Sequence, residues 1–473
     1  MYTFSPPASR RRPLVACIAS LLGLSLSSTA FATAWPVTSC DDNGLGTLRD
    51  VVGAAMTNDT VDLSGLVCPD SRISLTTGAI TVDQDTLQIS GPGAAALTVD
   101  ASGLGTSYGD YRVFTHTGTG TLVVSDLGLT GGHVNHFGVP SAGGCVYSSG
   151  DVALINANVS SCSAQNAGSF DTSGGAVYTK GDLTLKYSAL SGSTASSAGG
   201  NANGGGACAL GDFGAIYSTI SGNSASGNFG FGGGLTAGGN VTIARSTVSG
   251  NSSTGNIGGI DAFSASPAGL TTQIISSTIS GNSSGSKVGG VYTNSATVKV
   301  YSSTIAFNTA VVDGGVFGPG LALSGQSVAE SVNMQSSILS NNTYGLNEIE
   351  DDLTAVAGAN GVTFNVGPAN NLVRATFVPG LPSDTLKFAC PLLGQLRDNG
   401  GLTKTHALQS HSSAIDTGNN AIGDSFDQRS DVTINKTADY PRVSGTFADI
   451  GAYEVQQADI IFNYDFQGCP VLF

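Results

Sequence analysis

Three aspartates at a regular spacing are the first residues of this chain that could do chemistry. Asp151, Asp182 and Asp212 each follow a glycine and lie 31 and 30 residues apart. If the chain stacks on itself with that period, the carboxylates form a column, and oxygen ligands of this kind can hold calcium. Aspartate also recurs in turns, because its side chain accepts local hydrogen bonds. We favour the role in turns over calcium binding. Calcium is the one cofactor that the sequence suggests.

The other polar clusters are weaker candidates for a site. His133 and His136 have no third metal ligand nearby, and the acidic run 348–352 lacks the spaced ligands of a calcium loop. Ser412 and Ser413 lack the G-x-S-x-G turn of a nucleophile. Near the C-terminus we expect the charged residues to be ion pairs and turn contacts that fasten a loop-rich segment. These residues are Asp416, Asp427, Arg429, Arg442, Asp449 and Glu454. We therefore predict no catalytic residue.

The regular spacing comes from an internal repeat. Between Tyr217 and Val316 the chain contains four versions of one pattern, in which a β-branched run and an asparagine precede a Gly-Gly pair and another apolar residue. The Gly-Gly pairs recur every 25–31 residues from Gly144 to Gly315. Three short strands per period without helices are typical of a three-faced parallel β-helix. The predicted fold is therefore an all-β, right-handed solenoid whose repeats span residues 111–345.

Asparagine recurs three places after the central apolar residue of the repeat. Stacked side chains at that position would hydrogen-bond one another and the turn backbone as a ladder. The predicted ladder is Asn223, Asn251, Asn282, Asn308 and Asn341. Cys162 occupies the same position in its own coil, which predicts a small buried side chain and not a reactive thiol. Because these repeated residues are explained by stacking, we expect any function on segments that differ between coils, such as 196–204 and 224–231.

The first 32 residues are typical of a secretory signal peptide. Three arginines at 10–12 precede an apolar run at 14–26, and Ala-Phe-Ala at 30–32 fits a cleavage site. We therefore expect export of the Gram-negative type and a secreted or cell-surface location, where disulfides can form. Cys40 and Cys68 are the first predicted pair and Cys390 with Cys469 the second. Seven cysteines follow the signal, so at least one has no partner within the chain.

Composition excludes some classes of partner. The chain has 18 basic and 33 acidic residues, a net charge of -15, and therefore lacks the basic surface that binds nucleic acid. No stretch after the signal is long and apolar enough for a transmembrane helix. An acidic surface suits an extracellular protein. The expected partners are an extracellular glycan or a protein of a host or cell surface.

The two ends of the repeat region are expected to differ from it. Residues 33–110 should form an N-terminal cap and the first coils, with a helix at Thr47–Met56 that covers the open end of the core. Residues 346–454 should form a loop-rich C-terminal cap, and residues 455–473 a short tail.

Two sets of motifs resemble known families. Gly174–Val177 (GGAV) and Ile305–Asn308 (IAFN) resemble the repeats of polymorphic outer-membrane proteins, and Cys40–Val52 resembles the opening segment of such exported proteins. Leu392–Glu454 resembles the choice-of-anchor Q domain of bacterial surface proteins. These resemblances imply export, a β-helix, and a role in adhesion or surface display.

An enzymatic role is the alternative. Parallel β-helices also include polysaccharide lyases and glycoside hydrolases, whose sites need acidic residues that converge on one face. The repeat body has few acids, and we therefore favour adhesion, ligand binding or display over catalysis.

Overall fold

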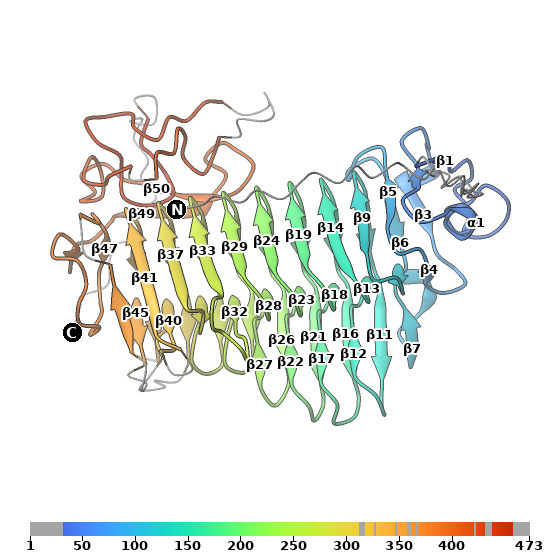
Figure 1. Cartoon of the computed structure of the whole chain (residues 1–473), viewed down its shortest axis with the longest axis horizontal. Helices are drawn as coiled ribbons and strands as arrows, with labels where there is room; N and C mark the ends of the chain where they lie inside the picture. The colour runs from blue at the N-terminus through green and yellow to red at the C-terminus, as the bar shows by residue number, and fades with distance from the viewer. Residues whose placement is uncertain are drawn as a thin grey trace, which may run out of the picture. The chain divides into compact units, whose positions relative to one another are not determined.

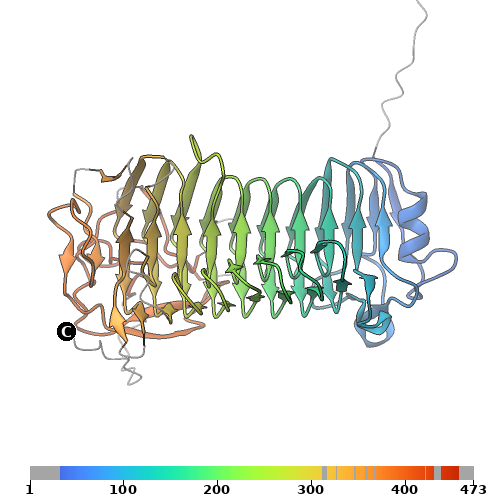
Figure 2. The same ribbon diagram turned by 90° about the horizontal axis from the view of Figure 1, so that it is seen from below.

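Short parallel strands stack coil upon coil along the unit that begins at Thr33 (Figures 1 and 2). The computed structural model describes residues 32–311, 317–325, 328–345, 348–356, 361–365, 368–420, 422–430 and 438–456. Nearly all of the predicted signal peptide and of the predicted tail lies outside these residues. Within them the parallel β-helix predicted from the repeat is confirmed.

One middle coil shows how the chain turns. It runs through β24 (Phe213–Ile216), β25 (Thr219–Ser221), β26 (Ser224–Ser226), β27 (Gly230–Phe231) and β28 (Leu235–Ala237), and then enters the next coil at β29 (Val241–Ala244). The strands β24 to β28 each pair in parallel with their equivalents in the preceding coil, and β24 pairs with β29 of the next coil. Three sheets, here named A, B and C, take the strands equivalent to β24, β25 and β28. Sheets D and E take those of β26 and β27, and they widen the connection between B and C.

Sheets C and E matter most below. Sheet C contains β4 (Ile80–Val82), β8 (Phe114–His116), β13 (Val146–Ser148), β18 (Val177–Thr179), β23 (Ala207–Ala209), β28, β32 (Ile260–Ala262), β36 (Val291–Thr293), β40 (Leu321–Leu323) and β45 (Leu353–Ala355). Sheet E contains β12 (Ser141–Ala142), β17 (Thr172–Ser173), β22 (Ala202–Asn203) and β27.

The core is a set of apolar columns. In sheet B, Ile220 pairs in register with Val248, Val248 with Ile279, and Ile279 with Ile305. All four side chains are fully buried. Side chains alternate between the two faces of a strand, so every inward position repeats in each coil. A single coil could not bury these residues, and stacking is what stabilises them.

The asparagine ladder is present, with one change of residue. Asn223, Asn251 and Asn282 each donate from Nδ2 to Oδ1 of the next asparagine at 2.9 Å, ending on Asn308. The backbone N–H of each of the three donates to the same oxygen at 3.0 Å.

Asn308 continues the ladder to Asn342 at 2.8 Å, and not to the predicted Asn341. In β42 (Ile338–Ser340) it is Leu339, not Ile338, that pairs with Ile305, and this moves the register by one residue. Ile338 instead packs outward against C-terminal residues such as Leu393 and Ile450. Asp352 ends the ladder by accepting from both nitrogens of Asn342.

A helix packs against the first coils at the N-terminal end. The helix α1 (Leu48–Ala54) begins after Thr47, whose side chain accepts from the Asp50 N–H. Its apolar face, which includes Val51 and Val52, is buried against the first coils. A disulfide joins Cys40 to Cys68, whose Cα atoms lie 5.6 Å apart. In the described part of the chain, no helix is long and apolar enough to cross a membrane.

The C-terminal segment differs from the expected cap. The described residues of its last part, from β49 (Leu393–Arg397) and β50 (Thr405–Leu408) to residue 456, lie along the outer face of sheet B instead of across the end of the coils (Figure 1). We call these residues, 393–420, 422–430 and 438–456, the arm. Hydroxyls on that face bond to it: Thr247 donates to the Lys404 carbonyl and Thr278 to Gln428 Oε1, at 2.6 and 2.7 Å. These outward threonines hold the arm against the side of the solenoid.

Candidate functional site

The three predicted aspartates do form a column. Asp151 Oδ1 accepts the N–H of Asp182 at 2.8 Å, and Asp182 Oδ1 accepts that of Asp212 at 2.7 Å. Asp212 in turn accepts the N–H of Asn240 at 2.7 Å. A Cβ on Gly181 would lie 2.1 Å from Asp151 Oδ1, which explains why glycine precedes the aspartate in the next coil. The carboxylates thus act as repeated turn acceptors, and among the described residues no group of three or more His, Cys, Asp or Glu could hold a metal.

The two histidines have separate partners. His133 Nδ1 lies 2.6 Å from Ser163 Oγ, whereas His136 Nε2 lies 3.1 Å from a carboxylate oxygen of Asp110. Burial lowers the pKa of His133, which favours its neutral form. Both histidines lie in the strand β11 (His133–His136), and these contacts join that strand to its neighbours.

The cysteines in the repeats are buried. Cys162, at the ladder position of its coil, forms a disulfide with Cys145 that the sequence did not suggest. Cys208 is free and buried, and burial raises the pKa of its thiol to about 12. Cys390 is disulfide-bonded, and its predicted partner Cys469 lies outside the described residues. None of these four cysteines is therefore a nucleophile at neutral pH.

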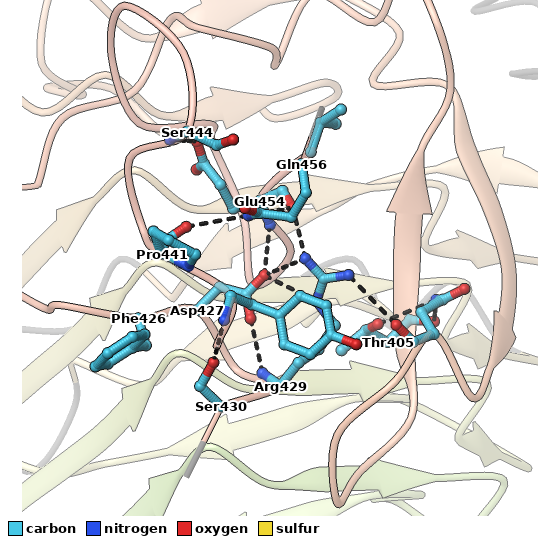
Figure 3. A network of polar contacts seen from close by, with 12 residues as sticks. Thr405, Phe426, Asp427, Arg429, Ser430, Pro441, Ser444, Glu454 and Gln456 are labelled. Carbon is cyan, nitrogen blue, oxygen red and sulfur yellow. Dashed lines mark hydrogen bonds and ion pairs between the residues drawn. The ribbon is translucent and has the colours of Figure 1, made fainter. Parts of the chain in front are cut away.

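The charged residues of the arm form a buried network (Figure 3). Arg429 and Asp427 pair at 2.8 Å with both side chains fully buried. The Arg429 guanidinium lies between the rings of Tyr440 and Tyr453, 3.8 and 3.9 Å from their centroids. A paired and enclosed cluster of this kind cross-links a loop-rich segment, and this is the role that we predicted for it.

Other arm residues complete this network. Arg442 donates to the Asp449 carbonyl, and Asp449 Oδ1 accepts the N–H of Asp416. Burial raises the pKa of Glu454 to about 8, and its carboxylate oxygens accept from the N–H groups of Ser444 and Asp449. These groups bond to one another and do not line any of the cavities described below.

A cleft of about 440 Å³ on the outer side of sheets C and E combines aromatic and polar side chains. Its floor is formed by outward residues of sheet C. Its wall is formed by residues of sheet E and, in the next two coils, by the segments between the strands of sheets D and C. It is lined by Asn203, Phe231, Thr236, Asn256, Ile257, Asp261, Phe263, Lys287, Val288, Tyr292 and Phe317. This cleft is the candidate site.

Asp261 is the unusual residue on the floor of the cleft. It is the central, outward residue of β32, in register with Thr236 of β28 and Tyr292 of β36. Its side chain is 3% exposed, and its Oδ1 has no hydrogen-bond partner in the described structure. Burial alone raises the pKa of this carboxyl to about 7. An unpaired buried carboxyl is costly, and such groups concentrate at functional sites.

Aromatic rings line the same cleft as that carboxyl. Tyr292 and Phe317 contact edge to face with centroids 5.5 Å apart, and the Lys287 ammonium lies 5.5 Å from the Phe317 centroid. Phe263, two residues after Asp261, is 48% exposed. An exposed ring beside a buried polar group offers both a stacking face and a hydrogen bond.

Part of this cleft was predicted from the sequence. Asn203 and Phe231 belong to the two variable segments where we expected function, 196–204 and 224–231. The remaining lining could not be assigned, because it comes from successive coils that are brought together only by the strand register.

A second cavity, of about 530 Å³, lies beside the arm. Tyr187 and Tyr217 stack there with centroids 5.3 Å apart, and Leu402 of the arm reaches its rim. Its described lining contains no charged side chain, so it offers weaker recognition than the cleft.

Comparison with known protein families, with curated protein sequences and with solved structures finds no match to this chain.

Proposed function

We propose that this chain is an exported β-helix protein that binds a carbohydrate in the cleft without cleaving it. The observation that carries the proposal is the buried, unpartnered Oδ1 of Asp261 among exposed and half-buried aromatic rings. Sugars present hydroxyls at their edges and apolar C–H faces. Ligand sites typically combine a mostly apolar lining with a few placed polar groups. Export rests on the signal-like residues 1–32, and the partner class on the acidic, non-basic composition.

Binding is favoured over hydrolysis by the number of carboxylates. Cleavage of a glycosidic bond by paired acids needs two carboxyl groups that flank the bond. In the described lining of the cleft, Asp261 is the one carboxylate. A lyase, which removes a proton next to a uronic acid carboxylate, is the enzymatic alternative that the experiment must test.

The experiment is a glycan-binding screen of the purified chain followed by calorimetry on the hits. Asp261→Asn and Phe263→Ala should each weaken binding at least about tenfold. The first replaces a carboxylate acceptor by a weaker, neutral amide, and the second removes a stacking face. Asp212→Asn is the matched control, since asparagine occupies the same position one coil later as Asn240.

Two results would contradict the proposal. Binding that survives Asp261→Asn but is lost in Tyr187→Ala would move the site to the second cavity. New reducing ends or unsaturated uronates formed by the wild type, and abolished in Asp261→Asn, would make the protein an enzyme.

A further inference from the structure

We infer that the sugar bound in the cleft is acidic, with its carboxylate held by Lys287. This inference rests on the proposed function and adds the chemical class of the ligand. Lys287 is the one cation among the described residues that line the cleft. The chain has only 18 basic residues against 33 acidic ones, so a cation positioned in a cavity is uncommon here.

Lys287 has no carboxylate partner. Among the described residues, no carboxylate oxygen lies within 4.0 Å of its ammonium, whose described neighbour is the Phe317 ring. The side chain is half-buried, so its charge is partly removed from solvent without being neutralised. An ammonium in this position attracts an anion more strongly than one on an open surface, because the local dielectric is lower.

Lys287 and Asp261 do not satisfy each other. They form no ion pair, because among the described residues no contact within 4.0 Å joins the Lys287 ammonium to an Asp261 carboxylate oxygen. Each group is therefore available to contact a different part of one ligand. Asp261 then bonds a sugar hydroxyl, Lys287 binds a carboxylate, and the rings of Phe263 and Phe317 cover the apolar face.

The size and charge of the protein narrow the ligand further. A volume of about 440 Å³ lies within the range of small-molecule sites, about 300–1,000 Å³, and suits one or two sugar units. The net charge of -15 repels a long polyanion. A single acidic group in the cleft is repelled less, because charges more than about 8 Å away are screened at physiological salt. The ligand is therefore a single acidic sugar at the end or at a branch of a glycan, and not a polyuronate.

The test compares sugars that differ only in the acidic group. Glucuronic acid is titrated against glucose, and galacturonic acid against galactose, by saturation-transfer NMR and calorimetry. The wild type should bind the acidic member of each pair at least about tenfold more tightly. Lys287→Gln should remove that preference, and Lys287→Arg should retain most of it. Thermal melting of both variants should match the wild type, because the side chain is half-exposed and makes no ion pair.

The outcomes separate this inference from the proposed function. Equal affinity for acidic and neutral sugars, with dependence on Asp261, would overturn the role of Lys287 and leave carbohydrate binding in place. An acidic preference that survives Lys287→Gln would also overturn it. If no sugar, acidic or neutral, binds at millimolar concentration, both proposals fail.

Discussion

Replacing Asp261 by asparagine should make the protein more stable at neutral pH while it removes ligand binding. In the folded chain the pKa of Asp261 is about 7, against 3.8 for an ordinary aspartate. The difference is about 3 pKa units, and each unit corresponds to about 1.4 kcal/mol. Ionised Asp261 therefore costs the folded state about 4 kcal/mol. We interpret that cost as the consequence of keeping a binding group unpaired.

The sign of the pH dependence follows from the raised pKa. Below pH 3.8 the carboxyl is neutral in both states and carries no penalty. As the pH rises to about 7, the unfolded chain ionises first, so the stability of the wild type falls; above pH 7 the penalty is constant. An asparagine at this position has no such dependence. An unpaired amide has a cost of its own at every pH. The quantity to measure is therefore the free energy of unfolding of the variant minus that of the wild type. This difference should rise by about 4 kcal/mol between pH 4 and pH 8.

Urea unfolding at pH 4, 6 and 8 measures this quantity. The wild type, Asp261→Asn and the exposed-site control Asp212→Asn are compared at each pH. Other buried acids, such as Glu330, whose pKa burial raises to about 8, contribute equally to all three proteins and cancel in the difference. If the wild type and Asp261→Asn have parallel pH profiles, Asp261 is not a buried unpaired carboxyl, and the reasoning behind the site is refuted.

Two further predictions concern the scaffold. Asn342→Ala should cost about 2–4 kcal/mol, because it leaves two Asn308 donors without their acceptor and removes one of the donors to the Asp352 carboxyl. Asn341→Gly, which keeps the left-handed backbone at φ 61°, should cost less than about 1 kcal/mol. Equal losses of unfolding free energy in the two variants would contradict the shifted register. Ile279→Asp should cost about 4 kcal/mol or more by placing a charge in the fully buried core, whereas the exposed Thr184→Asp should leave the melting temperature almost unchanged. A small effect of Ile279→Asp would mean that this column does not face inward.

The features that repeat in every coil were the ones that could be predicted from the sequence. The β-branched runs and the asparagines recur with the coil, so each coil supports the interpretation of the next, and the stacked fold follows. The exception, Asn341 against Asn342, arose where two apolar residues precede two asparagines, so that both registers fit the pattern equally well. Cys162 likewise fitted a ladder position, and its disulfide with Cys145 depends on a turn geometry that spacing does not reveal.

Features that join distant parts of the chain could not be predicted in this way. The arm was expected at the end of the solenoid because it follows the last coil in sequence. Its actual place is set by pairs such as Thr278 with Gln428, which are 150 residues apart. The cleft is likewise formed by residues that are distant in sequence. Asp261 occupies a position that holds Thr236 and Tyr292 in the adjacent coils, so the residues beside it in the sheet are distant in sequence.

The central claim, that the cleft binds a sugar, is tested most directly by a crystal structure of the chain soaked with its best acidic sugar. The account predicts a sugar ring against Phe263, a hydroxyl within hydrogen-bond distance of Asp261 Oδ1, and the carboxylate beside the Lys287 ammonium. A sugar seated instead between Tyr187 and Leu402, with the cleft empty at the same concentration, would contradict it.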